Sequence, residues 1–219
     1  MTIEHVSRMR DHWWWRPGWR VGRHFYACHF TLADHPALVD LVARYQSALS
    51  GVPGLDLIPA QWLHLTTQGI GFVDEVSDVQ LRDLRLHLDA CLAELPAPTV
   101  TFHRPVVRPE AVYLPAEPAA PVAAVRSALR RAVAEVLGAG RVEADPVQGF
   151  RPHVSVAYSN GERPAEPIVA ALAEVDADPV AVTLSRIDIL AFHRDNRMYE
   201  WTSAEGTPIG HGSRHGRQA

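Results

Sequence analysis

Two short segments of the chain repeat the same order of side chains, and this repeat constrains the fold more than any other feature. "WLHLTT" contains His64 and Thr66, and "PHVSVAYS" contains His153 and Ser155. In both, one apolar residue separates a histidine from a hydroxyl residue, and the neighbours are typical of a buried strand. Alternate residues of a strand point to the same side, so each histidine shares a face with its hydroxyl residue. We therefore expect two strands, close to half of the ordered chain apart, that each present an imidazole and a hydroxyl.

The rest of the pattern predicts an α+β fold. Helical spacing of apolar residues occurs in four segments, 33–51, 77–95, 120–138 and 165–175. Strand-like segments lie between them, and several can pair locally, which favours antiparallel sheets over a doubly wound parallel sheet. We predict two pseudo-symmetric lobes, each an antiparallel sheet with outer helices, and an active-site cleft between the lobes.

No low-complexity linker divides the sequence, so we predict a single domain over 1–219. Its ordered core is expected at about 13–205, after a loosely ordered start. The segments 180–195 and 198–203 are predicted to form a final hairpin. The tail, 206–219, has few apolar residues, and we expect it to be disordered.

Composition excludes several classes of protein. The net charge is −4, which argues against a protein that coats extended duplex nucleic acid. Cys28 and Cys91 lie in no close motif, so neither a disulfide framework nor a Cys-x-x-Cys metal site is indicated. The N-terminal residues lack the apolar core of a signal peptide, and no run has the length of a membrane span. We expect a cytoplasmic protein without a membrane partner.

The repeated residues have a chemical use. Histidine exchanges a proton near neutral pH, so one neutral and one protonated imidazole make a base and an acid. The hydroxyls of Thr66 and Ser155 can donate hydrogen bonds to phosphate oxygens. Such a site needs neither a metal nor a cofactor, and we predict none. For either motif alone a structural histidine is the more common explanation; the two copies together favour catalysis.

The paired motifs resemble those of the two-histidine (2H) phosphoesterase superfamily, which includes 2′-5′ RNA ligases and 2′,3′-cyclic nucleotide phosphodiesterases. Gly71 after the first motif, and Phe150 and Pro152 before the second, match positions that often flank the motifs in that family. The resemblance covers most of residues 20–203. Tyr158 stands where ligase-like members usually carry arginine, and in this it resembles some cyclic phosphodiesterases.

The resemblance implies catalysis by His64 and His153, with phosphate bound by Thr66, Ser155 and Tyr158. The implied reaction is the opening of a 2′,3′-cyclic phosphate, on a nucleotide or a short RNA, to a 2′-phosphate. One alternative is 2′-5′ RNA ligation or cleavage at the same site. An alternative of another class is a module that binds RNA ends or nucleotides without turnover. Which histidine is the acid stays open.

The segment "WWWRPGW" also allows two interpretations. Its tryptophans, Trp13 to Trp15 and Trp19, could stack on bases as in single-strand binders. Alternatively, the segment crosses the fold as a strap and buries tryptophan against it. We favour the strap, which can still form a wall of the cleft.

Overall fold

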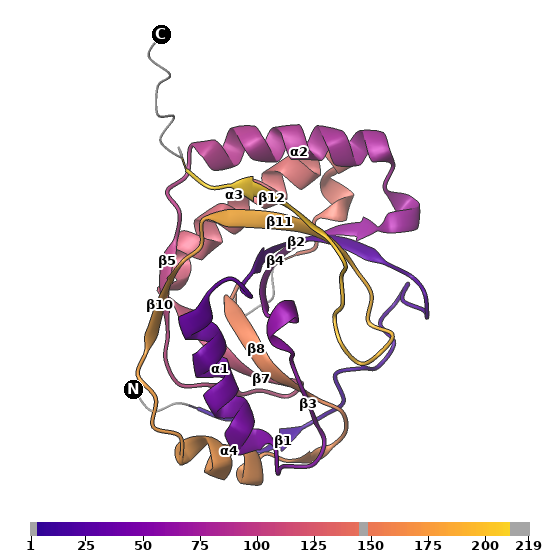
Figure 1. Cartoon of the computed structure of the whole chain (residues 1–219). Helices are drawn as coiled ribbons and strands as arrows, with labels where there is room; N and C mark the ends of the chain where they lie inside the picture. The colour runs from indigo at the N-terminus through magenta and orange to yellow at the C-terminus, as the bar shows by residue number, and fades with distance from the viewer. Residues whose placement is uncertain (1–3, 145–148, 211–219) are drawn as a thin grey trace.

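The protein folds into two main antiparallel sheets with helices packed against them (Figure 1). The computed structural model describes residues 4–144 and 149–210. The larger sheet has the strand order β10-β5-β7-β8-β3, with β6 paired to β7, and the smaller has the order β12-β11-β2-β4. All these strand pairs are antiparallel. The predicted α+β class with antiparallel sheets is therefore confirmed.

The strands of the larger sheet are β3 (Leu55–Leu57), β5 (Thr99–Phe102), β6 (Val106–Val107), β7 (Ala111–Glu117), β8 (His153–Ser159) and β10 (Val180–Thr183). Those of the smaller sheet are β2 (Phe25–Thr31), β4 (His64–Phe72), β11 (Arg186–Phe192) and β12 (Ala204–Pro208). A separate short pair joins β1 (Arg8–Met9) to β9 (Arg163–Pro164).

Four α-helices of the described residues cover these sheets: α1 (Pro36–Leu49), α2 (Asp78–Ala93), α3 (Ala119–Leu137) and α4 (Glu166–Ala173). Helices α2 and α3 pack on each other and contact β12 and β4, and Figure 1 shows α2 lying along the smaller sheet. Helix α1 contacts β8 and β10 of the larger sheet and packs on α4. The described residues also form three short 3₁₀ turns, η1 (Ala60–Trp62), η2 (Val73–Glu75) and η3 (Ala139–Arg141).

Neither sheet is built from one half of the chain. The C-terminal strands β11 and β12 extend the smaller sheet, and the early strand β3 pairs with β8 in the larger one. Helix α1 follows a strand of the smaller sheet but packs on the larger, whereas α3 follows β7 but packs on β4. Both sheets therefore depend on the whole chain, and a cut between the halves would interrupt both.

A final hairpin exists, as predicted, but it joins β11 to β12 rather than 180–195 to 198–203. β10 pairs with β5, whereas β11 pairs with β12 and β2, so the chain passes from one sheet to the other after Thr183. Residues 198–203 contribute only an isolated bridge between Glu200 and His193. Alternation of apolar residues indicates a strand but does not specify its partner, and this is why the pairing was missed.

Structured segments extend beyond 13–205 at both ends. The early segment expected to be loose contains β1, and the backbone N–H of His12 donates to the carbonyl of Ser159. At the other end β12 reaches Pro208, and Ile209 is buried. The rest of the predicted tail, 211–219, lies outside the described residues.

Helix α2 begins with a capping box. The Ser77 hydroxyl accepts from the backbone N–H of Gln80, and the Gln80 side chain accepts from the backbone N–H of Ser77. These bonds satisfy two groups that a helix start otherwise leaves unpaired. The buried stripe of this helix has helical spacing, which turns it toward the sheet; it consists of Leu81, Leu84, Leu88 and Leu92.

Replacing this cap is expected to weaken the fold moderately. Ser77→Ala should lower the free energy of unfolding by about 1 kcal/mol, because α2 loses a side-chain acceptor. Urea unfolding followed by circular dichroism measures it. The matched control is Ser127→Ala, since Ser127 is exposed and its hydroxyl donates to the Ala123 carbonyl of its own helix. That change should stay within about 0.5 kcal/mol; equal losses would contradict the role of the cap.

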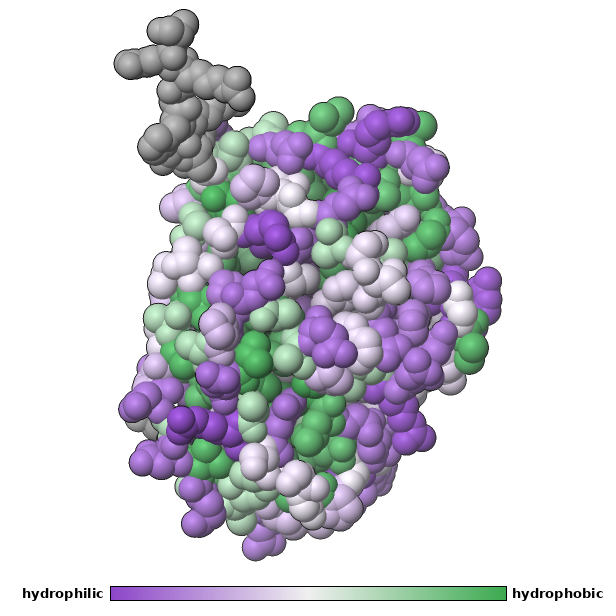
Figure 2. Space-filling model, in the orientation of Figure 1, coloured by the Kyte–Doolittle hydropathy of each residue, from purple (hydrophilic) through white to green (hydrophobic). Residues whose placement is uncertain are grey.

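The outer surface is mixed in character. Figure 2 shows hydrophilic and apolar residues interspersed on one face of the molecule. Among the described residues the exposed large apolar side chains are Trp14, Trp15, Val21, Val79 and Leu86. In the described part of the chain, no helix combines the length and apolar character that a membrane span requires.

Candidate functional site

The first histidine of the repeat stands at the start of β4. Its neighbours Leu63 and Leu65 are buried, so strand alternation turns the imidazole of His64 away from them. Nδ1 of His64 donates to the carbonyl oxygen of Trp62 at 2.7 Å, since a carbonyl can only accept. This bond fixes the ring and leaves Nε2 to take or give a proton.

The second histidine is held in the same way at the start of β8. Val154 and Val156 are fully buried on one side of the strand. Nδ1 of His153 donates to the carbonyl of Arg151, again two residues earlier, at 2.8 Å. The Tyr113 ring stacks on the imidazole with 4.1 Å between centroids. Both histidines of the repeat therefore have the same anchor and present the same ring nitrogen.

Each strand has a β-bulge three residues after its histidine. In β4, Gln68 is opposite Cys28 and Thr66 is opposite His29, which leaves Thr67 as the extra residue. In β8, Ala157 and Ser155 are opposite Val112 and Tyr113, so that the residue between them, Val156, is extra. A bulge inserts one residue and re-aims the side chains that follow it.

The backbone carbonyl at each bulge accepts a hydrogen bond from a side chain of a helix. Nε of Arg126, on α3, donates to the carbonyl of Thr67 at 2.9 Å. Nε2 of Gln46, on α1, donates to the carbonyl of Val156 at 3.0 Å. The Val156 carbonyl also accepts from the backbone N–H of Ile58 at 3.1 Å, so the side-chain donors reinforce the bulges. The two strands thus share the anchor, the bulge and a helical support.

The bulge in β8 explains the position of Tyr158. Strict alternation would put it on the side of Val154, away from His153. After the bulge Tyr158 is instead on the side of Ser155, since Tyr158 and Ser155 are opposite Ala111 and Tyr113 of β7. Burial raises the pKa of Tyr158 strongly, whereas the side chain of Ser155 lowers it. Tyr158 is therefore a neutral phenol at physiological pH.

The two predicted hydroxyl residues differ in their surroundings. Thr66 is exposed on β4, whereas Ser155 is only 9% exposed. Tyr158 is 4% exposed, since the imidazole of His12 stacks on its ring at 4.2 Å between centroids. The most accessible of the predicted phosphate donors is thus Thr66.

The two histidines of the repeat are electrostatically coupled. Strands β4 and β8 belong to different sheets but contact each other. Burial lowers the pKa of His64 to about 4, and the charges of His153 and His12 lower it too, against the bond to Trp62. Burial also lowers the pKa of His153, against the bond to Arg151. In the free protein at pH 7 both imidazoles are therefore mainly neutral.

Sequence reasoning missed several residues around this pair. The ring centroids of His29, Trp201 and Tyr199 lie 4.8, 5.6 and 6.0 Å from that of His64. His12 contacts both Tyr158 and Tyr199. Most of these residues lie in irregular segments, without a repeat or a motif. The tryptophan-rich segment and the loop after β11 were the only signals that could have pointed to them.

In the segment Trp13 to Trp19, the first and the last tryptophan pack against the fold, as expected of a strap. Nε1 of Trp13 donates to Asp56 at 2.7 Å, and its ring is only 9% exposed. Trp19 packs among Phe25, Phe72 and Phe192. The tryptophans between them, Trp14 and Trp15, are 48% and 50% exposed. The strap interpretation thus holds for the two end tryptophans, and the middle two remain accessible.

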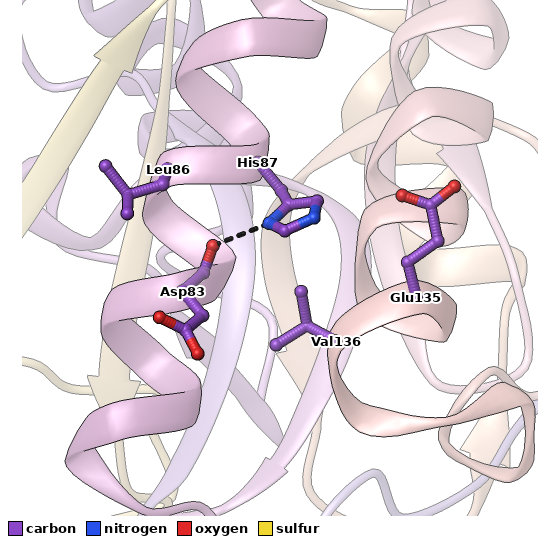
Figure 3. A pocket seen from close by; sticks show the side chains of 5 residues that line it. All are labelled: Asp83, Leu86, His87, Glu135 and Val136. Carbon is purple, nitrogen blue, oxygen red and sulfur yellow. Dashed lines mark hydrogen bonds between the residues drawn. The ribbon is translucent and has the colours of Figure 1, made fainter.

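A hollow between α2 and α3 is separate from the histidine pair (Figure 3). It is lined by Asp83, Leu86, His87, Glu135 and Val136. Nδ1 of His87 donates to the Asp83 carbonyl of the preceding turn at 2.9 Å. Among the residues that the structure describes, no cluster of three or more histidine, cysteine or acidic residues could hold a metal ion. Cys28 and Cys91 are free thiols.

Several solved structures share the fold of this chain. Protein TT0787 of Thermus thermophilus matches with a TM-score of 0.60 at 22% identity, over 85% of this chain and 97% of that one. E. coli LigT, solved with ATP, matches with a TM-score of 0.56 at 16% identity, over 86% and 99%. LigT with 3′-AMP gives 0.55 at 14% identity, over 85% and 98%. No curated protein matches the sequence.

The chain thus has the antiparallel α+β fold of the LigT structures, and each of two contacting strands carries a histidine and a hydroxyl residue. The chain belongs to the 2′-5′ RNA ligase superfamily, whose sequence profile matches residues 25–196. That range contains both histidines of the repeat, and the resemblance seen in the sequence is confirmed.

Proposed function

We propose that the protein opens 2′,3′-cyclic phosphates of nucleotides or RNA ends to 2′-phosphates, with His64 and His153 as the acid/base pair. The observation that carries this proposal is the matched setting of the two imidazoles. Each is anchored through Nδ1 to the carbonyl two residues earlier, and the charge of one lowers the pKa of the other. Both Nε2 atoms are then available to one substrate.

In this proposal the lower pKa of His64 makes it the base. Neutral His64 takes a proton from water as the water oxygen attacks phosphorus. Protonated His153 gives its proton to the departing O3′, so the ring opens and the phosphate stays on O2′. The hydroxyls of Thr66 and Ser155 donate to the non-bridging oxygens, whose negative charge grows during the attack. Tyr158 lies on the same side of β8 as Ser155 and contributes beside it.

We further propose that the two sheets form two related lobes with the site between them. Support comes from the matched anchors, bulges and helical donors of β4 and β8. The phosphodiester would enter where β4 and β8 contact each other. No metal or cofactor takes part in the proposed steps.

The proposed substrate is a nucleotide or a short RNA end. The LigT structures that resemble this chain were solved with ATP, NADP+ and 3′-AMP. All three are phosphorylated nucleotides, which supports a site of this chemistry. Strand joining is the second candidate, because the matching superfamily is named for 2′-5′ RNA ligation. It would require an RNA 5′-hydroxyl in place of water.

The test is turnover of 2′,3′-cyclic AMP in the presence of EDTA, followed by ³¹P NMR. We expect 2′-AMP, and little 3′-AMP. A parallel reaction contains RNA with a cyclic phosphate end and RNA with a 5′-hydroxyl, and a joined product would establish ligation. Binding of 2′-AMP without any turnover would leave the binding module as the function. Formation of 3′-AMP as the main product would contradict the assignment of the leaving oxygen.

A further inference from the structure

A third histidine links the candidate site to a partly buried acidic residue. Nε2 of His12 lies 3.0 Å from the hydroxyl of Tyr199, and Nδ1 lies 3.4 Å from Oε2 of Glu110. The second contact is long for a hydrogen bond, but Nδ1 is buried and has no other partner among the described residues. The three side chains thus form a series: Glu110, His12, Tyr199.

The imidazole of His12 is held in place from several sides. Its backbone N–H donates to the carbonyl of Ser159, and its own carbonyl accepts from Nη2 of Arg194 at 2.9 Å. Its ring stacks on Tyr158 at 4.2 Å between centroids and meets Trp13 edge-on at 4.8 Å. The side chain is 10% exposed. A ring so enclosed presents its two nitrogens in fixed directions.

The charges set the direction of the hydrogen bonds. Although burial alone would raise the pKa of Glu110, its contacts with His12 and Arg16 lower it to about 2, so it is a carboxylate. A carboxylate only accepts, so Nδ1 of His12 carries the proton. Burial lowers the pKa of His12, and in the neutral ring Nε2 is therefore an acceptor. The Tyr199 hydroxyl then donates to Nε2, which leaves its oxygen lone pairs available.

Tyr199 lies beside the proposed base. Its ring centroid is 6.0 Å from that of His64 and 5.6 Å from that of Tyr158. The Tyr199 ring therefore lies in the same group of side chains as the base and the proposed phosphate contacts. A water molecule that loses one proton to His64 has a second hydrogen, and that hydrogen needs an acceptor.

We propose that Tyr199 contacts the attacking water and that His12 and Glu110 are positioning residues which orient its hydroxyl for this purpose. The water donates one hydrogen bond to Nε2 of His64, which removes that proton during attack. It donates the other to the Tyr199 oxygen, whose own proton stays on the bond to His12. The inference rests on the proposed hydrolysis and adds a preference for water over alcohols.

The preference follows from counting hydrogens. An alcohol, such as methanol or an RNA 5′-hydroxyl, has one O–H hydrogen, which goes to His64. It has none to donate to Tyr199, so the relay should assist hydrolysis more than transfer to an alcohol. A side chain that only supported the fold would affect both reactions alike.

The test measures both products from 2′,3′-cyclic AMP in buffer containing methanol. Tyr199→Phe should lower formation of 2′-AMP by about tenfold, the loss of one hydrogen bond to a reacting group. Formation of the methyl ester of 2′-AMP should change by less than about twofold. His12→Phe, which keeps a ring over Tyr158, should have the same effect and add little in the Tyr199→Phe background. His12→Gln, whose amide oxygen can accept from Tyr199, should recover part of the activity.

The matched control is Tyr26→Phe, which removes a tyrosine hydroxyl from β2 that takes no part in these contacts. It should leave the ratio of the two products unchanged. An unchanged ratio in Tyr199→Phe, with wild-type turnover intact, would overturn the relay but not the hydrolase. A wild-type protein without turnover would overturn both proposals. Equal melting temperatures of the variants separate chemistry from loss of fold.

Discussion

His64→Ala and His153→Ala are each expected to lower kcat/KM for a 2′,3′-cyclic phosphate by about a thousandfold, within the range of about 10² to 10⁴ for general acid–base catalysis. Each change removes one of the two proton carriers while β4 and β8 keep their buried side chains. The double variant should be little worse than either single one, since the residues act as a unit. Initial rates with 2′,3′-cyclic AMP measure this.

The matched control for this experiment is His87→Ala. His87 is an exposed histidine of α2, and its ring donates to the Asp83 carbonyl of its own helix. It should retain wild-type kcat/KM. A loss below about threefold in either His64→Ala or His153→Ala would remove the basis of two-histidine catalysis, provided that circular dichroism shows a folded protein.

The pH dependence of kcat/KM should be bell-shaped with a maximum on the acid side of neutrality. The active form needs His64 neutral and His153 protonated. Burial and the neighbouring histidines lower the pKa of His64 to about 4, and burial lowers that of His153 from 6.5. The acid limb should follow His64 and the alkaline limb His153, so the maximum falls between about pH 4 and pH 6.5. Without burial, the ordinary pKa values of two histidines would place the maximum of kcat/KM around neutrality. A rate maximum above about pH 7, or a flat profile, would therefore contradict the burial of the pair.

The same pKa shifts predict how stability varies with pH. Both histidines have lower pKa values in the folded protein than the value of 6.5 expected in the unfolded chain. The unfolded chain therefore binds more protons between about pH 6.5 and pH 4, and the free energy of unfolding falls as the pH falls through this interval. In His64→Gln the loss of stability toward about pH 4 should be smaller.

Much of the fold was predictable because its helices are amphipathic. The segment 77–95 has apolar residues at helical spacing behind Ser77, and α2 indeed spans Asp78–Ala93 with that serine as its cap. The segment 120–138 ends in glycine, and α3 ends at Leu137. Local patterns of this kind depend on neighbours within a few residues, so the sequence displays them directly.

Pairing between distant strands was less predictable. The first and the last strands show why: β1 pairs with β9, and β12 with β11, through backbone groups that carry no sequence signal. The four repeated residues could be singled out because their spacing matches a strand face. Tyr158 came only from the resemblance, since alternation places it on the opposite face and the bulge at Val156 was not foreseen.

The third histidine was beyond prediction for a similar reason. His12 has no motif around it, and its role depends on Glu110 and Tyr199, which are far from it in the sequence. A buried histidine between a carboxylate and a phenol can be recognised only when the fold brings the three together. The N-terminal segment, expected to be loose, thus provides part of the candidate site.

The central claim is that Nε2 of His64 and Nε2 of His153 face one phosphate. A crystal structure with 2′-AMP bound tests it most directly. We predict one phosphate within hydrogen-bond distance of both Nε2 atoms, with the Thr66 hydroxyl also in contact. A phosphate bound elsewhere, or one that reaches only one of the two imidazoles, would contradict the account.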